Sequence, residues 1–191
     1  MDVIFGGYFP KNVVPGPDGP QIPGVFEICS VSECLSRGPE GWVAHWLHNE
    51  LGWYDSPELA RKVIPAITAA FEVFGYGLAT TFYESGRQLP LIVKSSAAPL
   101  LETEWASLGF DVVGRSQTSF FECSPLSCNG MASEIPVNRH CLLDHPESAL
   151  AVADRFSREE PEPGSYYIVQ VWRERQRQAP SHLRGSSLDA T

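Results

Sequence analysis

The stretch ECLSRGPEGWVAHWLHNELGWYDSPELA, residues 33–60, returns 89 positions later as ECSPLSCNGMASEIPVNRHCLLDHPESA, residues 122–149. The two stretches align without a gap and share residues of several chemical types. The matched pairs are Glu33/Glu122, Cys34/Cys123, Gly41/Gly130, Asn49/Asn138, Asp55/Asp144, Pro57/Pro146, Glu58/Glu147 and Ala60/Ala149. Unrelated segments rarely keep one register over such a length, so this pattern indicates an internally duplicated unit.

The motif Asp-x-Pro-Glu precedes an apolar stretch of helical period in both copies. Asp55 and Asp144 are therefore expected to cap a helix, with proline in its first turn and Glu58 or Glu147 completing a capping box. The asparagine six residues upstream in each copy fits a turn, because asparagine tolerates left-handed backbone and bonds nearby backbone groups. The repeated motif is thus interpreted mainly as a determinant of the fold.

Outward from the two copies, the chain divides into five segments that together form one compact domain. They are a strand with a Pro/Gly-rich arm (1–24), a first repeat (25–87), a linking strand-helix-strand (88–114), a second repeat (115–172) and a flexible basic tail (173–191). Each repeat is predicted to run strand, helix, helix, strand. This order predicts an α+β fold with pseudo-two-fold symmetry.

Apolar spacing gives a more detailed prediction for the individual elements. Helices are expected at 41–48, 59–74, 99–108 and 146–156, and strands at 2–9, 25–31, 78–83, 89–93, 110–113, 118–122 and 166–172. The helix at 59–74 has the clearest apolar face, and Gly75 and Gly77 are expected to end it.

The composition is that of a globular protein with an acidic surface. Of 191 residues, 43% are hydrophobic and 19% charged, with a net charge of −9. Residues 1–172 hold 10 basic and 21 acidic residues, a net charge of −11. Such a surface repels phosphate backbones, which argues against nucleic-acid binding and favours a basic protein partner.

The chain begins without a secretory signal pattern, and no apolar stretch approaches the length of a membrane span. An odd number of cysteines, five, in such a chain favours reduced thiols over a disulfide framework. These features predict a soluble cytoplasmic protein that does not bind a membrane. Nothing in the sequence predicts its oligomeric state.

The cysteines suggest two kinds of chemistry besides simple packing. Cys29 and Cys34 share the spacing C-x4-C with Cys123 and Cys128, which leaves a structural zinc site as an alternative. The two pairs do not superpose in the repeat, so buried packing thiols are the main expectation, with no metal and no cofactor.

The sharpest enzymatic hypothesis is a cysteine-dependent hydrolase or transferase. Cys128 lies in a turn of small residues that could precede a helix N-terminus, where a thiol becomes acidic. His140 is the candidate base, and Asp144 or Asn138 the residue that orients it. The first copy has Pro39 and Leu51 at the positions of Cys128 and His140, so at most one half would be active.

The main hypothesis is a binding protein. Trp46, Trp53 and Tyr54 lie close together in sequence beside Glu50, and tryptophan and tyrosine are the side chains that anchor interfaces. Trp53 and Tyr54, in the turn before the helix, are expected to be the exposed anchors. The predicted function is therefore protein-protein interaction, in the form of an inhibitor or immunity-type protein that masks a basic surface such as a nuclease active site.

Overall fold

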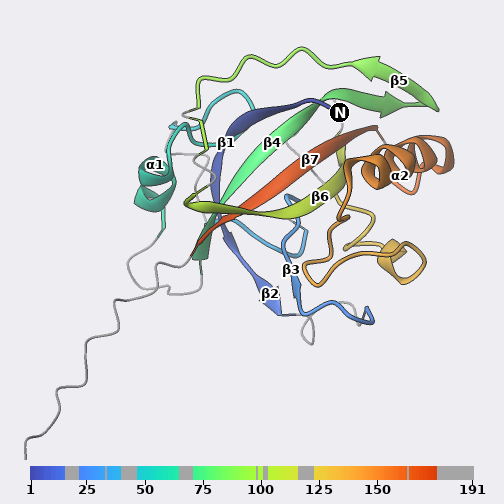
Figure 1. The fold of residues 1–191 in the computed structure, drawn as a ribbon, viewed down its shortest axis with the longest axis horizontal. Helices are drawn as coiled ribbons and strands as arrows, with labels where there is room; N and C mark the ends of the chain where they lie inside the picture. The colour runs from blue at the N-terminus through green and yellow to red at the C-terminus, as the bar shows by residue number, and fades with distance from the viewer. Residues whose placement is uncertain are drawn as a thin grey trace, which may run out of the picture.

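The computed structural model describes residues 1–15, 22–32, 34–39, 47–64, 71–97, 99–100, 103–115, 123–162 and 164–175. A 5-stranded antiparallel sheet forms its centre, in the order β1-β4-β7-β6 with β5 paired to β4 (Figure 1). Its strands are β1 (Val3–Asn12), β4 (Phe71–Glu84), β5 (Arg87–Pro90), β6 (Trp105–Arg115) and β7 (Ser165–Glu174). A separate short pair joins β2 (Val14–Pro15) to β3 (Glu27–Ile28).

Helices cover only part of the sheet. They are α1 (Pro57–Lys62), the 3-10 turn η3 (Met131–Ser133) and α2 (Pro146–Glu159). Helix α1 packs on β1 and β4, whereas α2 lies against β4, β6 and β7 near one end of the sheet (Figure 1). Within the described ranges, no helix has the length and apolar character needed to cross a membrane.

The side chains that α2 buries follow the helical period. Ala149, Val152, Ala153 and Phe156 line one face and are all buried. Such a stripe is driven onto the sheet by burial of apolar area. The Phe156 ring lies 5.8 Å from the ring of Tyr166 on β7, which fixes the helix at the start of that strand.

The structure mixes strands and helices and is mostly sheet, which confirms the α+β class. The strands expected at 2–9, 78–83, 110–113 and 166–172 lie within β1, β4, β6 and β7, allowing for one residue at the first boundary. The helix expected at 146–156 is the first part of α2.

The helix predicted at 59–74 is wrong at its end. Helix α1 stops at Lys62, and strand β4 begins at Phe71, so Gly75 and Gly77 lie inside a strand. This central strand is buried for most of its middle and reads as a continuous apolar run. Periodicity alone does not separate such a run from a buried helix.

Two predictions in the linking segment are also wrong. Residues 105–108 belong to strand β6 rather than to a helix at 99–108, although Trp105 and Leu108 happen to have helical spacing. The strand β5 ends at Pro90, and Ile92 beyond it is 90% exposed, so 89–93 is no buried strand. The last two residues of the helix expected at 41–48 are not helical, because His48 forms a β-bridge with Tyr54. The rest of that helix (41–46), the strand expected at 118–122 and residues 176–191 lie outside the described residues.

The predicted aspartate caps are corrected by the structure. Ser56 is the N-cap of α1, and its Oγ accepts from the backbone N–H of Leu59 at 3.3 Å. The N-cap of α2 is His145, without a side-chain cap bond. Asp55 and Asp144 do not cap, because each carboxylate accepts a hydrogen bond from the asparagine six residues upstream.

Asn49 organises the loop that leads into α1. Its Nδ2 donates to the Gly6 carbonyl at 2.9 Å and to Asp55 Oδ1 at 3.0 Å. Its Oδ1 accepts from the backbone N–H groups of Leu51 at 3.0 Å and Trp53 at 3.2 Å. The side chain therefore ties the loop both to β1 and to itself.

Asn138 makes the corresponding bonds before α2. Its Nδ2 donates to the Leu108 carbonyl at 2.7 Å and to Asp144 Oδ1 at 3.0 Å. Its Oδ1 accepts from the backbone N–H groups of His140 at 2.9 Å and Leu142 at 3.2 Å. The backbone bonding expected of these asparagines is thus confirmed. Their expected left-handed conformation is wrong, because the positive φ values in the loops belong to Gly52 (79°) and Cys141 (61°).

Candidate functional site

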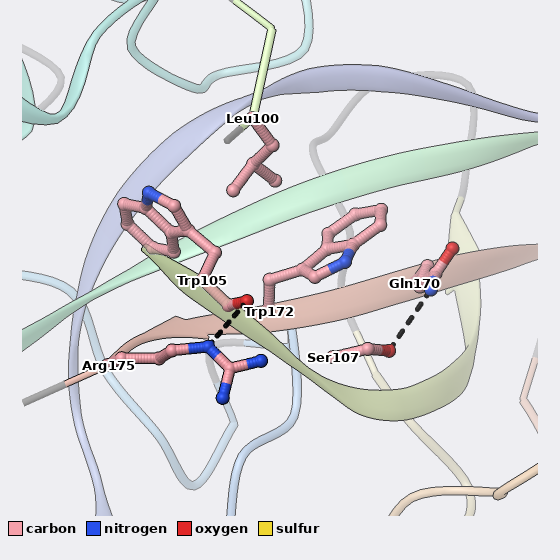
Figure 2. Close-up of a pocket in the computed structure, with 6 residues that line it drawn as sticks. All are labelled: Leu100, Trp105, Ser107, Gln170, Trp172 and Arg175. Atoms are coloured by element: carbon pink, nitrogen blue, oxygen red, sulfur yellow. Dashed lines mark hydrogen bonds between the residues drawn. The ribbon is translucent and has the colours of Figure 1, made fainter. Parts of the chain in front are cut away.

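A pocket of about 360 Å³ opens on the sheet near the end of β7. It is lined by two tryptophans, one leucine and three polar side chains: Leu100, Trp105, Ser107, Gln170, Trp172 and Arg175 (Figure 2). Tyr166 and Ile168 near the start of β7 are fully buried in the cluster that includes Phe156 of α2. Because side chains alternate along a strand, Gln170 and Trp172 continue that same face beyond the helix. We call this site the two-tryptophan pocket.

Two glycines of β4 make room for the pocket. A Cβ on Gly77 would lie 2.9 Å from ring atoms of Trp172, and a Cβ on Gly75 would lie 3.0 Å from Leu100 Cδ1. Both distances are shorter than normal carbon contacts, so a larger residue would displace these side chains. The pattern FGYG therefore lets Trp172 and Leu100 lie directly on the backbone of the central strand.

Aromatic rings connect the two tryptophans beneath the pocket. Trp172 meets Phe5 edge to face at 5.9 Å between ring centroids, and Phe5 meets Tyr8 in the same way at 4.9 Å. Tyr8 contacts Trp105 at 5.2 Å. Such contacts fix the orientation of each ring, so both indoles are held in place before any partner binds.

Polar groups of the pocket are partly engaged with one another. Gln170 Nε2 donates to Ser107 Oγ at 3.1 Å, and Arg175 Nε donates to the Trp105 carbonyl at 3.3 Å (Figure 2). In Figure 2 the terminal nitrogens of Arg175 point away from the Trp105 carbonyl, and the Gln170 carbonyl oxygen points away from Ser107. They provide hydrogen-bonding groups of both kinds around an apolar centre.

Carboxylates lie close to this aromatic row. Burial raises the pKa of Tyr8, and the negative charges of Glu58 and then Glu104 raise it further. Glu174, next to Arg175 in sequence, forms a short ion pair with Arg61. Glu58 and Glu104 thus lie near Tyr8, whereas the charged side chain among the described residues that line the pocket is Arg175.

The geometry suits a side chain with an apolar stem and a polar end. The two indoles and Leu100 offer apolar area. Ser107, Gln170 and Arg175 offer hydrogen-bonding groups for the polar end.

The anchors expected from the sequence are not on the surface. Trp53 is 4% exposed and Tyr54 0%, because the loop before α1 folds back onto β1. The backbone of Tyr54 pairs with Tyr8 through two hydrogen bonds of 2.8 Å. The expectation that Trp53 and Tyr54 form an exposed pair is therefore wrong. Glu50 is exposed as expected, and Trp46 lies outside the described residues.

Cys128 does not form the predicted triad. Its sulfur lies in a group with those of Cys34 and Cys123, all within 4.8 Å of one another. In the part of the chain that the structure describes, no hydrogen bond joins Cys128 to His140. Asp144 accepts from the loop asparagine and does not orient an imidazole. This geometry does not support the hydrolase hypothesis.

His140 instead belongs to a charged group with Glu27, Cys29 and Arg173. Its Nδ1 lies 2.6 Å from Glu27 Oε1, while Arg173 donates to both Glu27 oxygens at 2.8 and 3.0 Å. Burial opposes ionisation of Glu27, but Arg173 and His140 outweigh it and lower the pKa of this carboxyl. Burial raises the pKa of the Cys29 thiol, which is 2% exposed and so is poorly suited to act as a nucleophile.

The sequence contained a usable signal for the pocket. Glycine at alternate positions of an apolar, aromatic run is typical of a strand that another group approaches closely. Helical spacing predicts instead that Gly75 and Gly77 end a helix and that residues 99–108, with Trp105 among them, form another. The pocket was not predicted because these parts of strands β4 and β6 were expected to be helices.

Comparisons with protein-family models, with curated proteins and with solved structures gave no match for this chain.

Proposed function

We propose that this protein acts by binding another protein, as an inhibitor or immunity-type protein that covers a basic surface in the cytoplasm. The observation that carries this proposal is the two-tryptophan pocket, which takes the place of the Trp53 and Tyr54 anchors. Tryptophans held in a preformed pocket are typical of residues that contribute most of the affinity at a protein interface.

The charge balance of the chain supports a partner with a positively charged surface. Several basic side chains are already bound within the protein. Arg155 and Arg158 pair with acids of α2, and Arg173 pairs with Glu27. Since residues 1–172 carry a net charge of −11, the field outside the molecule favours approach of a cationic surface.

Replacing Trp172 with alanine is expected to weaken capture of the partner, whereas Trp105, at 5% exposed, mainly supports the pocket from the core. A hot-spot tryptophan is worth about 2 kcal/mol or more, so the Trp172 replacement should weaken binding by roughly 30-fold. The full chain is immobilised and exposed to extract of its host, and captured proteins are identified and then purified for kinetic measurement. A basic protein should be captured, with an association rate that falls as salt rises.

Phe26 provides a matched control, since it is 67% exposed and does not line the pocket. Phe26→Ala should retain the partner. Trp105→Ala is measured alongside as a stability control, because Trp105 is 5% exposed and its removal changes the core. Full affinity in a folded Trp172→Ala variant would contradict the proposal. An association rate that does not change with salt concentration would contradict it as well.

We infer further that the two halves descend from one duplicated unit. The support is the matched surroundings of the two asparagine loops. The strand glycine facing each loop has positive φ, 145° at Gly7 and 133° at Gly109. One residue later, each strand bridges to its loop, as Tyr8 to Tyr54 and Phe110 to Leu143. In the sheet order β1-β4-β7-β6, β4 and β7 pair at the centre. The strand β1 then pairs with β4 on one side, and β6 pairs with β7 on the other.

Asn49→Ala and Asn138→Ala are expected to destabilise the protein by similar amounts, about 2–3 kcal/mol each. Each substitution leaves backbone donors of a partly buried loop without an acceptor. Urea unfolding followed by tryptophan fluorescence measures both, with the exposed Asn12→Ala as the control. A large cost in one loop and none in the other would argue against equivalent roles.

A further inference from the structure

We propose that Cys34, Cys123 and Cys128 form a binding site for one thiophilic d¹⁰ metal ion, Zn²⁺ or Cu⁺. We call these residues the three-thiol group. Nothing in this proposal depends on the protein-binding function, because the group shares no residue with the two-tryptophan pocket.

The spacing of the sulfur atoms fits a metal. All three lie within 4.8 Å of one another. With metal-sulfur bonds of about 2.3 Å, three thiolates around one ion are about 3.8–4.0 Å apart, so only small side-chain rotations are required. Thiolate donors select zinc and cuprous copper over harder cations.

Two thiols of the group are open to solvent. Cys34 is exposed and Cys128 partly exposed, whereas Cys123 is buried, as are Cys29 and Cys141 outside the group. An ion can therefore reach the group from solvent.

Asp111 on β6 holds together the two segments that supply the thiols. Its Oδ2 accepts from Ser30 Oγ at 2.7 Å and from the Val31 N–H at 3.0 Å. Its Oδ1 accepts from Ser124 Oγ at 2.6 Å. Asp111 therefore fixes the segment before Cys34 against the one that begins at Cys123.

Further contacts join the segments at the thiols themselves. Ser32 Oγ lies 3.7 Å from Cys128 Sγ and accepts from the Cys34 backbone N–H at 3.2 Å. The group is therefore positioned across two segments that are distant in sequence, and it contains three of the four thiols that the C-x4-C spacing had suggested. Cys29, the fourth thiol of the predicted site, lies instead with Glu27 and His140.

Glu162 is the candidate for a fourth ligand. Its Oε1 lies 3.6 Å from Cys123 Sγ and 2.8 Å from Asn129 Nδ2. Zinc takes four ligands in a tetrahedron and accepts carboxylate or water oxygen besides sulfur. Copper(I) prefers sulfur and does not need this oxygen. The response to replacing Glu162 therefore distinguishes the two ions.

The test is a metal titration of the full, reduced chain under anaerobic conditions. Cadmium serves first as a spectroscopic probe, because its thiolate complexes absorb in the ultraviolet, and Zn²⁺ and Cu⁺ are then compared in competition with chelators. One equivalent is expected to bind. Cys34→Ser, Cys123→Ser and Cys128→Ser should each lower the affinity by about 100-fold or more, exceeding the 10–100-fold effect of supporting residues.

Cys29→Ala is the matched control and should keep the affinity of the wild type. Bound metal should also raise the unfolding temperature of the wild type and protect Cys34 from alkylation. Glu162→Gln should weaken Zn²⁺ binding if zinc is the ion and leave Cu⁺ binding unchanged. Absence of one-to-one binding by the reduced wild type, or unchanged affinity in a folded Cys34→Ser variant, would overturn the proposal.

Discussion

Replacing Asp111 with alanine is expected to lower the free energy of unfolding by about 3–5 kcal/mol, because three buried donors lose their acceptor. The carboxylate is 0% exposed and accepts from Ser30, Val31 and Ser124. Chemical unfolding in the presence of a chelator measures the cost without metal. The exposed Asp2→Ala should change little.

The variant Asp111→Asn separates the effect of the buried charge from the effect of the lost hydrogen bonds. The amide has the same shape, so its oxygen can accept from Ser30 and Val31 while its nitrogen donates to the Ser124 hydroxyl. The substitution removes a buried charge and keeps the hydrogen-bonded frame. We expect Asp111→Asn to be at least as stable as the wild type at neutral pH, in contrast to Asp111→Ala.

The pH dependence of the two proteins should differ in a defined direction. Burial raises the pKa of Asp111 from 3.8 to about 6, against the hydrogen bonds of Ser124, Ser30 and Val31 that lower it. A carboxyl with a raised folded pKa contributes stability below about pH 4, and this contribution is lost as pH rises through about 6.

The stability of Asp111→Asn relative to the wild type should therefore increase by up to about 3 kcal/mol between pH 4 and pH 7. Unfolding curves at several pH values, with both proteins in the same buffers, check this. A difference that stays constant with pH would show that the Asp111 carboxylate is ionised throughout, stabilised by its three donors.

The sequence predicts α2 and β7 correctly, but not the helix at 59–74, although that segment has the clearest helical period. Helix α2 carries a clear stripe and a proline in its first turn, and β7 is a short apolar run between turn residues. Strand β4 was misassigned because a central strand that is buried on both faces shows little alternation of apolar and polar residues. In its case the sheet decided the conformation, and local propensity did not.

The candidate sites were harder to predict because they depend on contacts between distant segments. The two-tryptophan pocket joins Trp105 to Trp172, and the three-thiol group joins Cys34 to Cys128. The repeat identified the asparagine loops correctly as structural. It also drew attention to Trp53, whose aromatic character serves the core.

Lys11→Met is the second substitution for which a large effect is expected. Lys11 is 1% exposed, and its Nζ donates to the carbonyls of Val31, Ser32 and Ser36 at 2.8, 2.6 and 2.7 Å. In the sequence this lysine follows the strand expected at 2–9, within the Pro/Gly-rich N-terminal segment, and no pattern predicts a role for it. In the structure it anchors the segment 31–36, which includes Cys34, to the end of β1.

Methionine retains most of the volume of lysine but offers no donor, so three inward carbonyls would lose their hydrogen bonds. The expected loss is about 3–5 kcal/mol of unfolding free energy, as for removal of one partner from a buried polar group. Lys62→Met, at an exposed position at the end of α1, is the control and should leave the urea midpoint almost unchanged. In folded Lys11→Met, Cys34 should also be alkylated faster and bind cadmium more weakly, since its segment is no longer held. An unaltered midpoint together with wild-type cadmium affinity would show that Asp111 and the serines position this segment without Lys11.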